Sequence, residues 1–284
     1  MEKLIHNEKF DEERALYGIS DTKVQNCDFD GPADGESAFK ECSNIEAEDC
    51  FFNLRYPLWH VDKAVIKNCR MTENCRAALW YDRDILIENC EMHGIKALRE
   101  CTGIELKNCD IISPEVLWKC SDIKIKSVQI ESEYPFFESS KLIIEDMKMK
   151  GKYSFQYVEE MIIINSFLDT KDAFWHSKNI TVYDSVVKGE YLGWYSENLR
   201  FVRCKIIGTQ PLCYCKGLIL EDCTMEGTDL AFERSEVEAD IKGRIDSVKN
   251  PLKGKIRADE IGELIIEPQY VNADDTVIEC KKNG

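Results

Sequence analysis

A repeat of 19 residues runs through most of this 284-residue chain and limits what it can fold into. One position of the repeat mostly follows an Asn, Asp or Ser and is small or apolar: Cys27, Cys50, Cys69, Cys90, Cys109, Val128, Met147, Ser166, Ser185, Cys204 and Cys223. From Cys90 to Cys223 there are seven steps of 19 residues without an insertion. A fixed period of this length is typical of a solenoid, in which each repeat packs against its neighbours.

Within each repeat, short runs of alternating residues predict two strands and a third short segment. In the phrase KNITVYDSVVKG, Ile180 and Val182 alternate with polar or amphipathic neighbours, and Asp184 separates this strand from the next. The third segment reads PLW, ALW, VLW, AFW or LGW. A unit this short cannot bury its apolar face alone, so we expect equivalent strands to stack about 4.8 Å apart.

The stacked repeats predict an all-β fold, a single-stranded right-handed parallel β-helix with three walls and about 11 to 12 coils. The one-residue corner with Asn68, Asn89 and Asn108 resembles the asparagine ladder of right-handed β-helices, and unequal inward spacings disfavour a left-handed hexapeptide helix. We expect residues 1–236 to form the β-helix and residues 237–284 to form a β-rich capping segment of the same domain, because an open end exposes unpaired backbone. Two interior columns of cysteines are expected, the one above and a second one made of Cys42, Cys101, Cys120 and Cys215.

Composition restricts the compartment and the partners. The start of the chain is charged throughout and no apolar run approaches membrane-spanning length, so we expect no signal peptide, no membrane anchor and a cytoplasmic protein. The 14 cysteines are then expected to be reduced thiols. A formal net charge of −16 disfavours nucleic acid, anionic membranes and long polyanions unless a local basic strip exists.

Seven phrases spread over the chain resemble an uncharacterised bacterial family, domain of unknown function 3737, of the pectin-lyase-like β-helix superfamily. They are ERALYG (13–18), GESAFKE (35–41), RYPLWH (55–60), RAALWY (76–81), KDAFWH (171–176), GEYLGWYS (189–196) and LAFERS (230–235). The resemblance implies the fold and no assigned activity. Proteins of the superfamily act on polysaccharides as lyases, hydrolases or binders, but neither a calcium-binding acidic cluster nor an N-T-D phrase is found here.

The third segment predicts an aromatic stripe along the helix. Its middle position is often Trp, and by the 19-residue register Cys213 and Phe232 fall in this same column. The position before it is usually Leu or Phe. Strict alternation would place these two columns on opposite faces, and the sequence leaves open which one points outward. Either arrangement leaves amphipathic rings outside, which suits sugar binding as well as a structural ladder. The candidate ligand-binding residues are Trp59, His60, Trp80, Tyr81, Trp118, Tyr157, Trp175, His176, Trp194, Tyr195 and Tyr214.

Three charged residues of this stripe are candidate catalytic groups. Glu100, Lys119 and Glu138 occupy successive coils, which separates the carboxylates by roughly 9.6 Å. That distance lies at the upper edge of the geometry of an inverting glycosidase. Lys119 would keep both carboxylates ionised, whereas a general acid needs a raised pKa, so a structural ladder is favoured. The pair Cys213 and Cys215 is expected in the core, with no metal and no cofactor.

Two classes of function remain open from the sequence. The first is a carbohydrate-interacting protein, which as an enzyme would be a glycoside hydrolase or polysaccharide lyase acting on oligosaccharides. The alternative is a non-enzymatic scaffold or protein-binding module, favoured by the lack of long loops. An apolar strip on the outside of the first wall is expected to be covered by the C-terminal tail or to join two chains in a homo-oligomer. Its members are Ile143, Ile162, Ile164, Tyr183, Val202 and Ile219.

Overall fold

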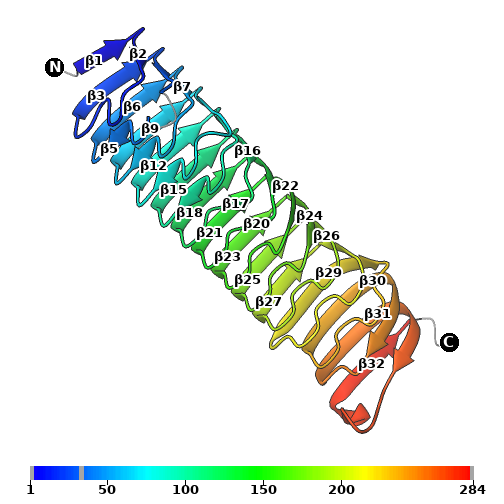
Figure 1. Ribbon diagram of the computed structural model, residues 1–284. Coiled ribbons are helices and arrows are strands. Elements are labelled where there is room, and N and C mark those ends of the chain that lie inside the picture. The colour runs from blue at the N-terminus through cyan, green and yellow to red at the C-terminus, as the bar shows by residue number, and fades with distance from the viewer. Residues whose placement is uncertain (1–2, 32–34, 282–284) are drawn as a thin grey trace. The chain divides into compact units, whose positions relative to one another are not determined.

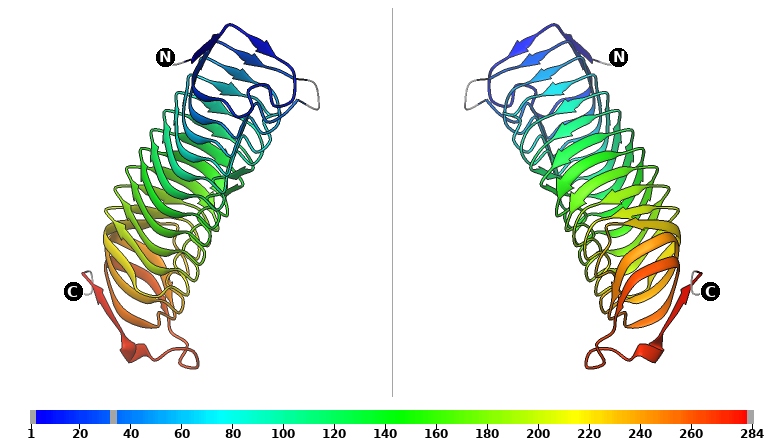
Figure 2. Two further views of the ribbon diagram at one scale, coloured as in Figure 1. Left: turned by 90° about the vertical axis from the view of Figure 1, so that its left-hand side faces the viewer. Right: turned by 90° about the vertical axis from the view of Figure 1, so that its right-hand side faces the viewer.

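The computed structural model describes residues 3–31 and 35–281, and over this range the fold is all-β. Parallel strands form a β-solenoid of about 14 turns, more than the 11 to 12 expected. The only helical element of the described residues is a single 3-10 turn, η1 (Ala273–Asp275). The chain divides into two compact units, residues 1–143 (unit 1) and 144–284 (unit 2). Within each unit, strands of successive turns lie side by side (Figures 1 and 2).

The first wall consists of six-residue strands for most of its length. In unit 1 they are β1 (Lys3–His6), β3 (Ser20–Gln25), β6 (Ser43–Glu48), β9 (Asp62–Lys67), β12 (Arg83–Glu88), β15 (Thr102–Lys107) and β18 (Ser121–Lys126), followed by β21 (Ser140–Glu145). In unit 2 they are β23 (Glu159–Ile164), β25 (Lys178–Tyr183), β27 (Glu197–Val202) and β29 (Leu218–Glu226). Their side chains alternate between buried and outward positions, as the sequence predicts.

The second wall is built from shorter strands. In unit 1 these are β2 (Lys9–Phe10), β4 (Asp28–Phe29), β7 (Phe51–Phe52), β10 (Arg70–Met71), β13 (Glu91–Met92), β16 (Asp110–Ile112) and β19 (Gln129–Ser132). In unit 2 they are β22 (Lys148–Lys152), β24 (Phe167–Lys171), β26 (Val186–Lys188) and β28 (Lys205–Ile207). The third wall holds β5 (Phe39–Lys40), β8 (Leu58–Trp59), β11 (Leu79–Trp80) and β14 (Leu98–Arg99), and the short pair β17 (Glu115–Val116) and β20 (Tyr134–Pro135) lies in the segment before it.

The 19-residue register is confirmed by the strand pairing. Ile85 pairs with Ile104, which pairs with Ile123 in the next coil. The backbone N–H of Asp110 donates to the Cys90 carbonyl and that of Gln129 to the Cys109 carbonyl, at 3.0 and 2.9 Å. Cys90, Cys109 and Val128 therefore occupy neighbouring rungs of one column.

The corner between the first two walls is the expected asparagine ladder. The side-chain amide of Asn89 donates to Asn68 at 3.2 Å, and that of Asn108 donates to Asn89 at 3.3 Å. All three residues have φ between 50 and 54°, a left-handed conformation that asparagine tolerates. One residue therefore suffices to turn the chain from one wall to the next.

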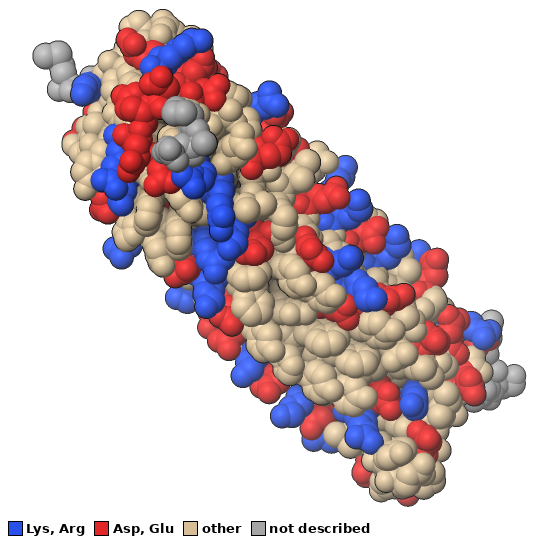
Figure 3. All heavy atoms as spheres, in the orientation of Figure 1, with Lys and Arg blue, Asp and Glu red and all other residues tan. Residues whose placement is uncertain are grey.

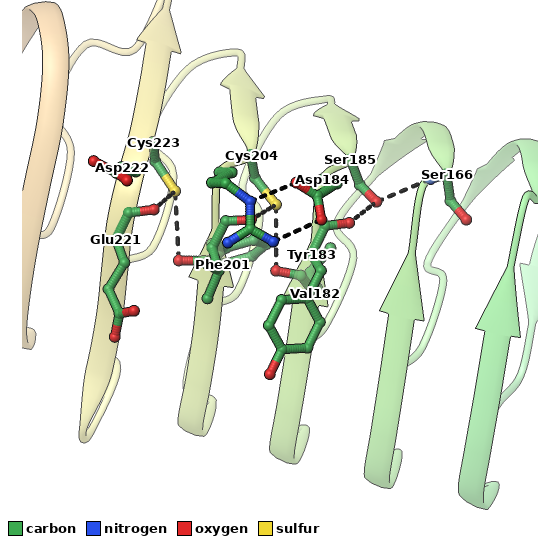
Figure 4. Close-up of polar contacts among 12 residues, drawn as sticks. Ser166, Val182, Tyr183, Asp184, Ser185, Phe201, Cys204, Glu221, Asp222 and Cys223 are labelled. Carbon is green, nitrogen blue, oxygen red and sulfur yellow. Dashed lines mark hydrogen bonds and ion pairs between the residues drawn. The ribbon is translucent and has the colours of Figure 1, made fainter.

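Both cysteine columns are buried, and their thiols donate hydrogen bonds to backbone carbonyls. In unit 2 the Cys204 thiol donates to the Val182 carbonyl at 3.3 Å, and the Cys223 thiol to the Phe201 carbonyl at 3.4 Å (Figure 4). Ser185 takes the same place in the column and accepts the N–H of Ser166 at 2.9 Å. No described cysteine forms a disulfide. Burial raises the pKa of the Cys75 and Cys109 thiols to about 11, which keeps them protonated.

The segment after residue 236 continues the solenoid. β30 (Glu236–Lys249) pairs in parallel with β29, β31 (Lys253–Ile265) pairs with β30, and β32 (Thr276–Cys280) pairs with β31. The tail therefore follows the stack instead of folding back across the first wall. This removes the covering role expected for it, because Ile162 remains 41% exposed.

The outer strip differs from the expected one in a second respect. In unit 2 its residues belong to two parallel columns, with Ile162 and Ile219 in one and Ile164, Tyr183 and Val202 in the other. Val202 is only 6% exposed, so it is buried and is not part of the exposed strip. Its backbone still pairs with Tyr183 of the outward column, so its low exposure reflects covering by neighbouring side chains and not a change of face. Ile143 of unit 1 is 48% exposed.

Candidate functional site

The third wall presents two adjacent aromatic columns to the outside, because alternation stops at its end. Leu58 and Leu79 point into the core, and Trp59 and Trp80 lie on the outer surface. The next residue in each coil has a left-handed backbone and is also outside, for example Tyr81 with φ 60°. The question left open by the sequence is thus answered: the Leu/Phe column is inside, and the Trp column and the column after it are both outside.

The register slips by one residue near the end of the stripe. The N–H of Gly208 donates to the Glu226 carbonyl, but that of Gln210 donates to the Asp229 carbonyl, so the chain between them holds one extra residue. Phe232 therefore occupies the inward column, where it is fully buried, and not the Trp column in which a strict period of 19 places it. Cys215 is buried in the second interior column, as predicted, while Cys213 is fully buried although its backbone aligns with Trp194 of the outer column.

In unit 1 the outer columns form an aromatic cluster around two stacked indoles. The rings of Trp59 and Trp80 lie 5.5 Å apart with an interplanar angle of 12°, and the Lys40 ammonium lies 4.1 Å above Trp59. Tyr56, which the sequence reasoning did not single out, contacts both indoles at 5.6 and 6.0 Å. We call Tyr56, Trp59, His60, Trp80 and Tyr81 the aromatic patch; the rings of the last two lie 5.2 Å apart.

In unit 2 the same columns form a longer and more regular ladder. Trp175 and Trp194 are stacked at 5.5 Å with an interplanar angle of 3°. Their neighbours stack at 4.9 to 5.1 Å in the order Tyr157, His176, Tyr195 and Tyr214. Each ring covers the face of the next, so the ladder offers ring edges to solvent. Desolvation raises the pKa of Tyr214, which keeps its phenol protonated.

The hydrogen bonds of the indole N–H groups distinguish the aromatic patch from this ladder. Trp175 donates to the Tyr191 carbonyl at 2.7 Å and Trp194 to the Gln210 carbonyl at 2.8 Å, each in the following coil. In unit 1, Trp118 donates in the same way to the Tyr134 carbonyl. The indole nitrogens of Trp59 and Trp80 are shielded from solvent and have no hydrogen-bond partner. An unpaired buried donor costs about 1–3 kcal/mol, so these two tryptophans are less well accommodated than the other three.

A cavity of about 490 Å³ lies beside the aromatic patch in unit 1. Residues flanking both departures from the 19-residue period line it, the first around Gly31 and Gly35 and the second around Asn74. Arg55 and Arg76 also line the cavity, and Arg55 directly precedes Tyr56 of the patch. Both insertions are visible in the sequence as departures from the period, but the period does not show that the residues flanking them line one cavity.

The catalytic candidates are partly exposed and take part in ion pairs. The Lys119 ammonium lies 3.5 Å from the Glu138 carboxylate, and both side chains are about half exposed. Glu100 lies 3.5 Å from the guanidinium of its own neighbour Arg99, which also stacks on the Trp118 ring at 5.3 Å. The ion pairs of the described residues thus join Lys119 to Glu138 and Glu100 to Arg99, and they do not link the three candidates in one ladder.

Asp82 is a buried acid that was not among the candidates drawn from the sequence. Asp82 is fully buried in the second interior column, between Val61 and Cys101. One of its carboxylate oxygens accepts the N–H of Val61 at 2.8 Å, and the other has no partner. Burial, with a smaller contribution from Cys101, raises the pKa of Asp82 well above its ordinary value. The spacing of the cysteines to either side would have placed it in the column.

The described residues contain no group of three or more His, Cys, Asp or Glu side chains able to hold a metal ion. Nor does any helix within the described range have the length and apolar character needed to span a bilayer.

Solved structures with a similar fold have little sequence in common with this chain. One is the surface adhesin PfbA of Streptococcus pneumoniae, with a TM-score of 0.40 and 11% identity over 79% of this chain and 70% of that chain. A second is the catalytic domain of a GH87 alpha-1,3-glucanase in complex with nigerose, with a TM-score of 0.37 and 8% identity over 97% and 63%. A third is the A-module of the mannuronan C-5 epimerase AlgE6 of Azotobacter vinelandii, with a TM-score of 0.36 and 9% identity over 96% and 87%.

The sequence matches none of the curated proteins. A family model described as "Protein of unknown function (DUF3737)" matches residues 3–279, nearly the whole length. The chain belongs to the family of proteins of unknown function DUF3737, the family that its repeated phrases resemble.

Proposed function

We propose that this protein binds carbohydrate without turning it over, and that the aromatic patch of unit 1 is the binding surface. The observation that carries the proposal is the pair of unused indole N–H groups of Trp59 and Trp80. Sugars are bound by amphipathic rings combined with hydrogen-bond donors, and the patch provides both within two neighbouring coils.

Access to these donors depends on Tyr56. Its ring lies against both indoles, at 5.6 and 6.0 Å, and is half-buried. A shift of this ring would open the indole nitrogens to sugar hydroxyl groups, which can accept the hydrogen bonds that the protein leaves unmade. Satisfying a donor that is unpaired in the free protein contributes to affinity, because no internal bond has to be broken first.

The ladder of unit 2 supports the choice of unit 1 by contrast. There the indole N–H groups already bind backbone carbonyls of the following coil. These contacts stabilise the stacking of coils and leave no unused indole donor for a ligand. We therefore assign Trp118, Tyr157, Trp175, His176, Trp194, Tyr195 and Tyr214 a mainly structural role.

Binding without turnover follows from the acidic residues of the third wall. Glycoside hydrolysis needs one carboxyl group that holds a proton and one that is ionised. Glu100 and Glu138 are each close to a cation, and the carboxyl of Asp82, whose pKa burial raises, is in the core, out of reach of any ligand on the surface.

The test combines a glycan array, calorimetric titration of the best-retained oligosaccharide, and a reducing-sugar assay. Trp80→Phe removes one unused donor and keeps an aromatic ring, while Trp194→Phe is the matched control. We expect Trp80→Phe to weaken binding roughly tenfold, Trp194→Phe to leave it within about twofold, and no variant to release reducing ends. Equal loss in both variants, silence on the array, or turnover by the wild type would each contradict the proposal.

A further inference from the structure

Two arginines of the cavity in unit 1, Arg55 and Arg76, occupy equivalent positions in neighbouring coils. The N–H of Tyr56 donates to the Arg76 carbonyl at 2.9 Å, the same bond that the N–H of Ser37 makes to the Arg55 carbonyl. Because Glu36 and Arg55 are bridged in parallel, this pattern puts Arg76 in register with Arg55. Like charges directly opposite one another on adjacent strands are destabilising, and here the strand spacing is about 4.8 Å.

Arg55 and Arg76 are only partly neutralised by acidic side chains. Elsewhere, cations commonly meet an acid one coil away, as Arg203 meets Asp184 and Lys188 meets Asp169. Arg55 lies 3.2 Å from Glu36 through one terminal nitrogen, while its Nε atom is shielded and has no partner. Arg76 forms no ion pair with any acidic side chain that the structure describes, although it is exposed at the cavity.

The rest of the lining is mixed, with apolar Leu54 and Ile95 beside a hydrogen-bonded polar network. Asn74 donates to the Asn53 side chain at 2.9 Å, and Asn53 in turn donates to Asp30 at 2.7 Å. This network ties the segment around Asn74 to the coil below it.

Among the described lining residues one acid, Glu73, accompanies the two arginines, and Glu36, which pairs with Arg55, is not part of this lining. In Figure 3 a track of Lys and Arg side chains crosses the surface of unit 1, in a chain whose net charge is −16.

We infer that this cavity binds a small oxyanion, a phosphate or a carboxylate, between the guanidinium groups of Arg55 and Arg76. Planar guanidinium groups bind both oxyanions through pairs of parallel N–H···O bonds. The bound anion would supply the charge that Arg76 lacks and relieve the repulsion between the two arginines. The site is separate from the indole nitrogens of the aromatic patch, so this inference stands whether or not the patch binds sugar.

Inorganic phosphate and acetate are the probes, titrated calorimetrically into the full chain at low ionic strength. We expect phosphate to bind and to raise the unfolding temperature, and acetate to compete with it for the same site. Arg76→Gln is expected to weaken phosphate binding at least about tenfold, because a hydrogen bond to a charged group is lost. Arg83→Gln is the matched control, since Arg83 is exposed at the start of β12 and lies outside the cavity lining.

The outcomes separate a site from a general charge effect. Binding of phosphate that is lost in Arg76→Gln and kept in Arg83→Gln supports the inference, and competition by acetate extends it to carboxylates. Absence of phosphate binding by the wild type, or equal weakening in both variants, overturns it. Both variants are also tested with the glycan that the aromatic patch retains, so that failure of the oxyanion site is told apart from failure of sugar binding.

Discussion

Asp82 offers a sharp test of the interior column, because a buried carboxyl makes stability depend on pH in a defined direction. Its side chain is fully buried, one oxygen accepts the Val61 N–H, and the other oxygen has no partner. The perturbation is Asp82→Ser. Serine is already used in this column, where the Ser139 hydroxyl accepts the N–H of Cys120 at 3.0 Å.

The direction follows from the raised pKa. Burial, and secondarily Cys101, hold the pKa of Asp82 above that of an unfolded aspartate, so the folded state keeps a proton that the unfolded chain loses. The stability of the wild type is then complete below about pH 3.9 and falls by about 1.4 kcal/mol per pH unit as the pH rises toward the folded-state pKa. Each unit by which the folded-state pKa exceeds the unfolded one corresponds to about 1.4 kcal/mol of stability lost at high pH.

The assay is urea unfolding of the wild type and the variant at several pH values between 5 and 8. We expect Asp82→Ser to be more stable than the wild type at pH 7, and its advantage to shrink by up to about 1.4 kcal/mol per unit as the pH falls. Asp62→Ser, at an exposed position in β9, is the control for the lost negative charge. A variant that is less stable at pH 7, or a difference that does not change with pH beyond that of the control, would refute the reasoning.

Three further predictions follow from the packing of the coils. Gly189→Ala is expected to destabilise unit 2 by about 3 kcal/mol or more, because its Cβ would lie 1.4 Å from the Thr170 carbonyl oxygen. Gly227→Ala has nothing within 4 Å of its Cβ and should cost only the roughly 1–2 kcal/mol of a left-handed alanine, and urea unfolding compares the two variants. The native protein should expose at most the partly accessible Cys280 to a thiol reagent, and all 14 cysteines after unfolding; several fast-reacting thiols in the native state would contradict the buried columns. If two chains join through Ile162, Ile164, Tyr183 and Ile219, sedimentation should show a dimer that Ile162→Lys dissociates, and a wild-type monomer at all concentrations would exclude this interface.

Much of the fold could be predicted because a strict period converts directly into spatial register. Once 19 residues make one turn, Cys90 must lie beside Cys109, and Asn89 beside Asn108, as the structure confirms. The prediction failed where the backbone leaves the extended conformation or the period changes. Tyr81 is outside with Trp80 because its φ is 60°, and Phe232 is inside because one extra residue precedes it.

The candidate site was predicted only in part, for a different reason. The sequence named Trp59 and Trp80, but it named Trp175 and Trp194 equally, since the local phrases are nearly the same. What distinguishes them is whether each indole N–H finds a carbonyl in the next coil, which depends on the path of that coil. Tyr56, Arg55 and Arg76 were overlooked because their importance comes from stacking between coils.

The most direct test of the account is a spectrum of the five indole N–H groups in protein labelled with nitrogen-15 at tryptophan. Adding the oligosaccharide retained on the array should shift the signals of Trp59 and Trp80 and leave those of Trp175 and Trp194 in place. Shifts confined to Trp175 and Trp194, or spread evenly over all five, would contradict a binding surface on the aromatic patch.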